Sequence, residues 1–106
     1  MRRRKQERLE KRGWRFGGAR EFLGLSNQEA AYVELRLRLA DSLKTRRRRR
    51  NLTQTALARL IRSSQSRVAK METGDPSVSL DLLVRSLLAL GASNRDLART
   101  ISSASP

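Results

Sequence analysis

The segment LTQTALARLIRSSQSRVAKMETG, residues 52–74, carries the pattern that decides the fold. Thr53 stands where a helix would begin, and the apolar spacing after it predicts about two or three helical turns that end near Arg62–Ser63. Ser64 is placed to cap a second helix, which Gly74 closes. The turn between these helices is too tight to let them lie antiparallel. The segment therefore predicts a helix-turn-helix, a motif whose second helix enters the major groove of DNA.

A long helix is expected before this segment. Ser26 and Glu29 stand at the spacing of a capping box and predict a helix start at about residue 27. Apolar residues alternate over residues 33–39 as they would in a strand, but the same region also contains apolar residues at helical spacing. Its content of Ala, Leu, Glu and Arg favours a helix, which we expect over residues 27–48.

Two further helices are expected after the segment. Ser79 is placed to cap a helix over residues 80–90, whose apolar residues form an i, i+3, i+4, i+7 stripe. Asn94 is placed to cap a last short helix, which would turn Ile101 towards the core. The sequence thus predicts an all-α fold, a compact five-helix domain over residues 26–102.

The two ends of the chain have a different character. Residues 1–25 form a basic N-terminal extension that we expect to be partly disordered, because nothing in its first part can bury an apolar face. Residues 103–106 are expected to be a flexible tail.

The composition narrows the classes of function. The chain has 24 Lys and Arg against 10 Asp and Glu, and its net charge of +14 favours a polyanionic partner such as nucleic acid. It has no cysteine or histidine, which excludes disulfides, thiolate metal sites and histidine-based catalysis. We expect no enzyme activity, no metal or cofactor and no small-molecule substrate. No apolar run reaches the roughly 18 residues of a membrane span or follows the basic N-terminus as in a signal peptide, so a cytoplasmic protein is expected.

The motif, with its caps and apolar spacing, resembles the Xre, or lambda repressor-like, family of DNA-binding proteins over roughly residues 35–101. The matching marks are Gln54 after the cap, the small Ala58 where the helices cross, Val68 in the second helix and the Glu72-Thr73-Gly74 ending. Arg62 departs from the pattern, since family members usually have glycine at this turn. The turn therefore either carries a left-handed residue or is built differently.

The second helix of the motif carries the candidate base readers. Val68 and Met71 are expected to face the core, so the opposite side of the helix faces outward. The residues predicted to contact bases are Gln65, Ser66, Ala69 and Lys70. Glutamine can bind adenine in a bidentate pair, serine can hydrogen-bond a base edge, and alanine can contact the thymine methyl group. The family resemblance implies that Gln54 braces Gln65 and also touches a phosphate.

A run of five arginines, Arg46–Arg50, comes directly before the motif. Cations at a helix C-terminus complement the helix dipole, and a targeting signal is a further alternative. The run nevertheless lies beside the start of the first motif helix, where the DNA backbone is expected, so several arginines should reach phosphates while others point away. The predicted phosphate contacts are Arg46, Arg47, Arg48, Arg49, Arg50, Thr53, Gln54, Arg62 and Arg67.

Two longer stretches, residues 14–47 and 64–91, look like HigA-type antitoxins and close Xre relatives. The resemblance implies a homodimer that binds a double-stranded DNA operator, represses its own promoter and neutralises a RelE-like ribonuclease toxin encoded beside it. Exposed aromatic residues anchor interfaces, which makes one apolar group in the extension the candidate for toxin binding. This group consists of Trp14, Phe16, Phe22 and Leu23. Alternatively, the same residues fold back over the helices.

Other functions remain open beside the antitoxin. The basic start of the chain, Arg2–Lys5, could be an arm that binds the minor groove or phosphates. The whole chain could be a stand-alone, prophage-like transcriptional regulator, or a basic RNA-binding or ribosome-associated protein. RNA recognition calls for stacking aromatic residues on the basic face, whereas three of the four aromatic residues precede the helical region. DNA is therefore the favoured partner.

Overall fold

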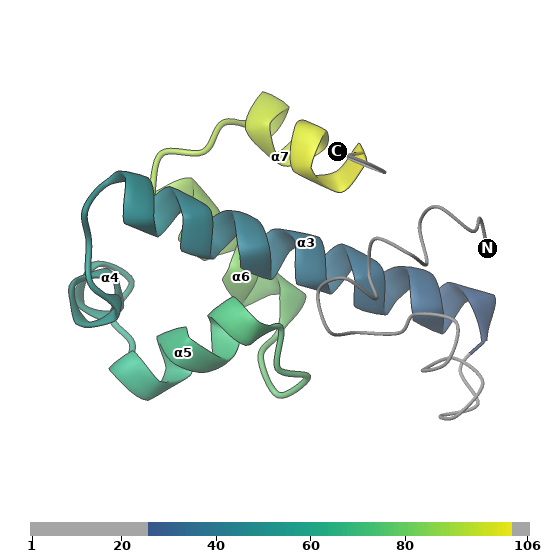
Figure 1. Cartoon of the computed structure of the whole chain (residues 1–106), viewed down its shortest axis with the longest axis horizontal. Coiled ribbons are helices and arrows are strands. Elements are labelled where there is room, and N and C mark those ends of the chain that lie inside the picture. The colour runs from purple at the N-terminus through teal and green to yellow at the C-terminus, as the bar shows by residue number, and fades with distance from the viewer. Residues whose placement is uncertain (1–25, 103–106) are drawn as a thin grey trace. The chain divides into compact units, whose positions relative to one another are not determined.

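Five helices make up residues 26–102, the part of the chain that the computed structural model describes (Figure 1). They are α3 (Asn27–Arg49), α4 (Gln54–Leu60), α5 (Gln65–Thr73), α6 (Leu80–Ala89) and α7 (Asn94–Ser102). No strand occurs within residues 26–102, so the predicted all-α fold is confirmed. Arg36–Ser102 form one compact unit, which contains both helices of the motif.

Several predictions fall outside the described residues. They concern the extension over residues 1–25, with Trp14, Phe16, Phe22 and Leu23, and the tail over residues 103–106. Among the helices of the described part, none combines the length and the apolar character that crossing a membrane requires.

Side-chain caps begin the helices at the positions that the sequence indicates. At the start of α3, the Ser26 backbone N–H donates to Glu29 Oε1 over 2.8 Å, and the Glu29 N–H donates to Ser26 Oγ over 3.1 Å. Thr53, Ser64 and Ser79 each accept a hydrogen bond from the backbone N–H three residues further on, at 3.0, 3.2 and 3.1 Å. Each cap satisfies a backbone donor that the first helical turn leaves open, which explains why these helices start where they do.

The cap of α7 differs from the prediction. Asn94 was expected to cap this helix, but it is the first helical residue, and Ser93 is the cap instead. Ser93 Oγ accepts from the Asp96 N–H over 3.0 Å, and the Ser93 N–H donates to Asp96 Oδ2 over 2.9 Å. Asp96 completes a reciprocal capping box only with the residue three positions before it, so the start of the helix moves by one residue.

The turn inside the motif is held by a residue in the left-handed region. Arg62 has φ 56°, in the place where family members usually carry glycine, so the first of the two alternatives for this turn is confirmed. After α5, Gly74 adopts φ 74° and ends the helix as predicted. A Cβ atom at Gly74 would lie only 2.9 Å from Cδ2 of Leu37, so the close approach of α3 also requires glycine here.

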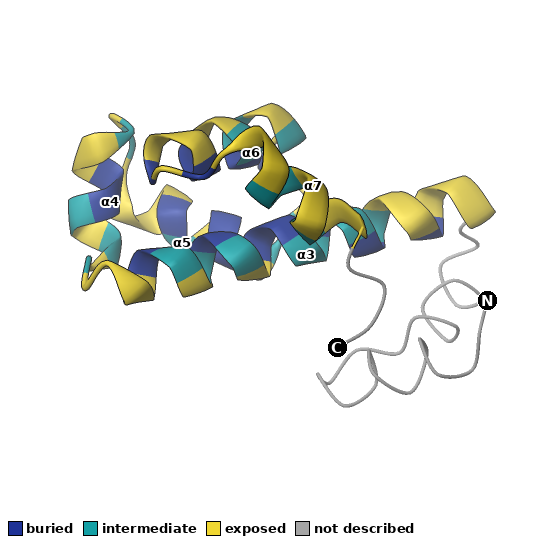
Figure 2. Cartoon of the chain, turned by 90° about the horizontal axis from the view of Figure 1, so that it is seen from above, coloured by how far each residue is buried: buried dark blue, intermediate teal, exposed yellow. Residues whose placement is uncertain are grey.

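The core of the compact unit is apolar and draws on every helix except α7 (Figure 2). Its buried apolar residues are Leu39, Ala40, Leu43, Leu57, Ala58, Val68, Met71, Val78, Leu83, Leu87, Leu90 and Ala92. The prediction that Ile101 of α7 faces inward is wrong, since 46% of this residue remains exposed. Polar contacts join α7 to α3, among them a 2.9 Å hydrogen bond from Arg38 Nη1 to the Ile101 carbonyl.

The arrangement of the helices leaves the second motif helix accessible. α4 packs against α5, and α5 and α7 lie on opposite sides of α3 (Figures 1 and 2). The side of α5 that faces away from α3 is therefore free of other described helices.

Candidate nucleic-acid interface

The outer face of α5 carries the predicted base readers. Val68 and Met71 are completely buried, so the opposite side of this helix faces outward. Gln65, Ser66 and Lys70 are exposed on that side, while Ala69 is half-buried. The structure therefore brings the four predicted base contacts together on one face, with Ala69 set deeper than the others.

A chain of hydrogen bonds fixes the amide of Gln65. Its Nε2 donates to Oε1 of Gln54 over 2.7 Å, and Nε2 of Gln54 donates to Oε1 of Glu72 over 3.1 Å. A carboxylate only accepts hydrogen bonds, so Gln54 must turn its amide nitrogen towards Glu72 and its oxygen towards Gln65. Gln65 is left with its own oxygen and one N–H hydrogen pointing outward. Those are the acceptor and the donor that a bidentate contact to adenine needs.

Arg47 holds the buried end of this series of hydrogen bonds in place. Its Nε and Nη2 lie 2.5 and 3.0 Å from Oε2 and Oε1 of Glu72, and its Nη1 donates to the Leu52 carbonyl over 2.7 Å. The side chains of Arg47 and Glu72 are only 10% and 2% exposed. The hydrogen bond to Glu72 raises the pKa of Arg47 against the opposing effect of burial, so the guanidinium stays charged.

The placement of Arg47 corrects one predicted phosphate contact. Its guanidinium is committed to Glu72 and to the Leu52 carbonyl, so it lies inside the fold and does not face a DNA backbone. Arg47 follows Leu39 and Leu43 at intervals of four residues, which places it on the core face of α3. The uninterrupted run of arginines in the sequence hides this difference from its neighbours.

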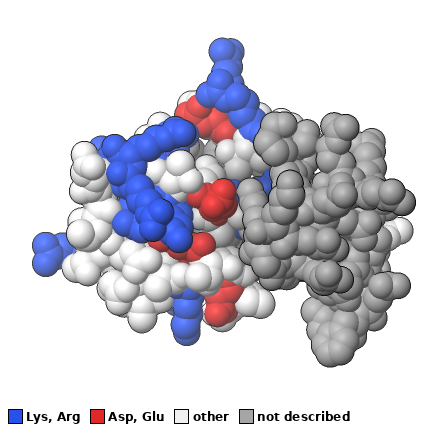
Figure 3. Space-filling view, in the orientation of Figure 1, with Lys and Arg blue, Asp and Glu red and all other residues white. Residues whose placement is uncertain are grey.

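The other arginines of the run divide into two groups. Arg46 lies 3.6 Å from Asp96 in an ion pair, and Arg50 Nη1 donates to the Leu90 carbonyl over 3.0 Å. Arg48 and Arg49 are exposed, and their side chains have no hydrogen bond or ion pair to any residue from 26 to 102. In Figure 3, Lys and Arg side chains gather over the C-terminal half of α3, where the run lies. Arg48 and Arg49 are thus the members that remain best placed for a polyanion.

The remaining predicted phosphate contacts lie in or next to the motif. Thr53 is exposed and uses its hydroxyl as the cap of α4, and Gln54 is half-buried because it bonds both Gln65 and Glu72. Arg62 and Arg67 are exposed, at the turn and in the first turn of α5. None of these placements conflicts with a phosphate contact.

Glu72 has a role in the site that its place in the sequence does not predict. In the sequence it stands out only as part of the helix ending that resembles the family. A signal was present, because Glu72 follows the buried Val68 by four residues and so lies on the core face of α5. A carboxylate on a core face requires a charged or hydrogen-bonding partner, and Arg47 provides it.

The comparison with protein families agrees with this geometry. A family model described as a helix-turn-helix domain matches residues 38–100, more than half of the chain. The chain therefore belongs to the helix-turn-helix domain family, of the Xre/Cro-like type, and is a DNA-binding protein of that class. Neither a curated protein nor a solved structure matches it.

Proposed function

We propose that this chain is a transcriptional repressor that recognises a DNA operator through α5, with Gln65 as the principal base reader. The observation that carries the proposal is the hydrogen-bonded chain from Arg47 through Glu72 and Gln54 to Gln65. A glutamine that only contacts solvent would not be held by such a series of hydrogen bonds. These bonds order the side chain of Gln65 and leave one edge of its amide free to contact a base. Ordering the reader before binding reduces the entropy lost on contact with a base.

The exposed basic side chains supply the part of the affinity that does not depend on sequence. Arg48, Arg62 and Arg67 all present charge to the solvent beside the motif. Each phosphate neutralised by such a side chain releases counterions and steepens the dependence of affinity on salt, by about 0.9 in the logarithmic slope.

The experiment is an operator selection from a random duplex library, followed by fluorescence anisotropy on the selected site. Gln65→Ala should lower the affinity by about 1–3 kcal/mol and should lose the preference at one base pair. Gln28→Ala is the matched control, because Gln28 is also an exposed helical glutamine but belongs to the first turn of α3. If Gln65→Ala weakens binding to every duplex equally, Gln65 is not a reader and the proposal fails.

We further propose that the repressor is the antitoxin of a type II toxin–antitoxin pair. The support is the resemblance of residues 14–47 and 64–91 to HigA-type antitoxins, together with the presence of Trp14, Phe16, Phe22 and Leu23 in the sequence of the extension. In this role the chain acts as a homodimer that represses its own promoter and binds a RelE-like ribonuclease toxin.

Co-expression tests the antitoxin role. The product of the neighbouring gene should arrest growth when expressed alone, and this chain should restore growth. Trp14→Ala should weaken the rescue while operator binding stays unchanged. A neighbouring gene whose product is harmless would instead leave a stand-alone regulator, with the operator proposal intact.

A further inference from the structure

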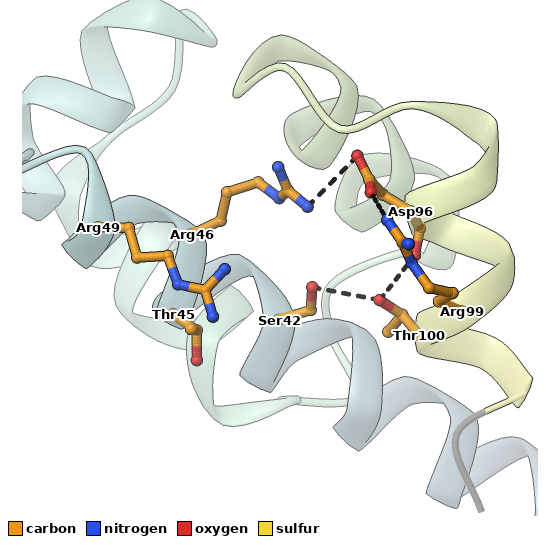
Figure 4. A pocket seen from close by; sticks show the side chains of 7 residues that line it. All are labelled: Ser42, Thr45, Arg46, Arg49, Asp96, Arg99 and Thr100. Carbon is orange, nitrogen blue, oxygen red and sulfur yellow. Dashed lines mark hydrogen bonds and ion pairs between the residues drawn. The ribbon is translucent and has the colours of Figure 1, made fainter.

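A polar hollow lies between α3 and α7, outside the DNA-reading face (Figure 4). Its volume is about 390 Å³, which falls in the range of about 300–1,000 Å³ typical of small-molecule sites. It lies on the side of α3 that is opposite to α5 (Figure 1). The base readers and the hollow are therefore on different faces of the compact unit.

Two helical faces meet at this hollow, and both are polar. From α3 come Ser42, Thr45, Arg46 and Arg49, which recur at the i, i+3, i+4, i+7 spacing of a single helical face. A helical face that packs against another helix usually carries apolar residues, as the core-facing side of α3 does. The side of α3 that faces α7 instead presents two hydroxyls and two guanidinium groups.

The face of α7 that lines the hollow is polar, like the face of α3 opposite it. Asp96, Arg99 and Thr100 stand at i, i+3, i+4 and line the other wall. α7 has no buried residue, and polar contacts join it to α3. One of these contacts is the 3.4 Å hydrogen bond between the hydroxyls of Ser42 and Thr100.

The charges of the hollow do not balance. Asp96 is the only acid among the described residues that line it, and it pairs with both Arg46 and Arg99. Arg49 has no ion pair or side-chain hydrogen bond within the described residues. Three guanidinium groups against one carboxylate leave an excess of two positive charges. Each guanidinium has five N–H donors, so those bound to Asp96 retain donors for a second anion.

We propose that this hollow binds a phosphorylated small molecule with at least two negative charges, such as a nucleoside diphosphate. Two phosphate charges would neutralise the excess, and arginine forks and hydroxyls are the groups that bind phosphate oxygens most effectively. The volume leaves room for an organic part beside the phosphates. Such a ligand would contact α3 and α7 at once and hold them together.

The test is a titration of the isotope-labelled full chain with inorganic pyrophosphate, at a constant ionic strength of about 0.15 M to screen non-specific attraction. The backbone amide signals of Thr45, Arg49 and Thr100 should shift and saturate. Arg49→Ala and Arg99→Ala should each lower the affinity by about tenfold, the usual effect of losing one charge-assisted hydrogen bond. Both side chains are exposed, so the melting temperatures should stay close to that of the wild type.

The matched control is Arg85→Ala. Arg85 is also an exposed helical arginine in an ion pair with an aspartate, but it belongs to α6 and does not line the hollow. It changes the net charge by the same amount and should leave the pyrophosphate affinity within about twofold of the wild type. An equal loss for Arg85→Ala would show non-specific attraction and would overturn the proposal.

A second titration, with operator or random duplex DNA, separates the two sources of phosphate. If duplex DNA shifts the amides of Thr45 and Thr100 while pyrophosphate does not, the hollow belongs to the DNA interface and the proposal of a small-molecule site is wrong. If pyrophosphate shifts these amide signals in the absence of DNA, the small-molecule site is supported, and this result does not depend on the operator proposal.

Discussion

Replacement of Glu72 by alanine should destabilise the domain by about 3–5 kcal/mol, because it leaves the charge of Arg47 buried without its partner. The size of the effect follows from the burial of both groups, whose side chains are 10% and 2% exposed, and from the two hydrogen bonds that join them. Domains of this kind have a total free energy of unfolding of about 5–15 kcal/mol. A large part of the stability of the domain should therefore be lost.

A double variant separates stability from function. Arg47→Met together with Glu72→Met replaces the ion pair by apolar groups, and such replacements of buried pairs are often neutral or stabilising. The remaining cost is the lost hydrogen bond to the Leu52 carbonyl, at about 1 kcal/mol. Gln54, however, loses its acceptor, so Gln65 is no longer braced. We expect a folded protein with a weakened base preference.

Urea denaturation followed by circular dichroism measures the stability, and fluorescence anisotropy on matched and mismatched duplexes measures the base preference. Arg85→Ala serves as the control, because it breaks an ion pair whose side chains are 76% and 75% exposed and should change the stability by no more than about 0.5 kcal/mol. A loss for Glu72→Ala as small as that of the control would refute the reasoning about burial. A double variant with the full preference of the wild type would refute the positioning role of the chain of hydrogen bonds.

Three further changes have predictable effects. Ser86 is fully buried and its hydroxyl has no hydrogen-bond partner among residues 26–102, so Ser86→Ala should raise the free energy of unfolding by about 1 kcal/mol in urea denaturation; a loss of stability would mean that the hydroxyl is satisfied. Arg62→Gly should relieve about 1 kcal/mol of left-handed strain, and so raise the melting temperature, while it lowers DNA affinity by removing a charge; a fall in melting temperature would count against the strain. Hydrogen bonds from Ser93 and Arg99 lower the pKa of Asp96 from 3.8 to about 2, so this group stabilises the fold above pH 3.8 and loses that effect as the pH falls towards 2. The urea midpoint of Asp96→Asn should therefore depend less on pH in this window than that of the wild type, and an identical dependence would exclude the contribution.

The helix boundaries could be predicted because the chemistry that sets them is local. Thr53, Ser64 and Ser79 each cap a helix by bonding an N–H three residues away, and such a contact can be recognised in any stretch of sequence. The one displaced cap, at Ser93, was missed because two adjacent residues could both serve, and the reciprocal bond with Asp96 decides between them. The outward face of α5 was predictable for the same local reason, since helical periodicity separates Gln65 from Val68.

The roles of individual arginines could not be predicted in this way. Arg46–Arg50 are chemically identical in the sequence, yet the fold pairs Arg47 with Glu72 and Arg46 with Asp96, and leaves Arg48 without a described partner. These partners lie 25 and 50 residues away along the chain, on helices whose packing against α3 is decided by the apolar core. Contacts within one helical turn follow from the order of the residues, whereas the environment of a charge depends on which helices surround it. The primary sequence therefore determines the caps, the helices and the class of partner. The packing of the helices determines whether each cation lies in the core, in the hollow or in the solvent.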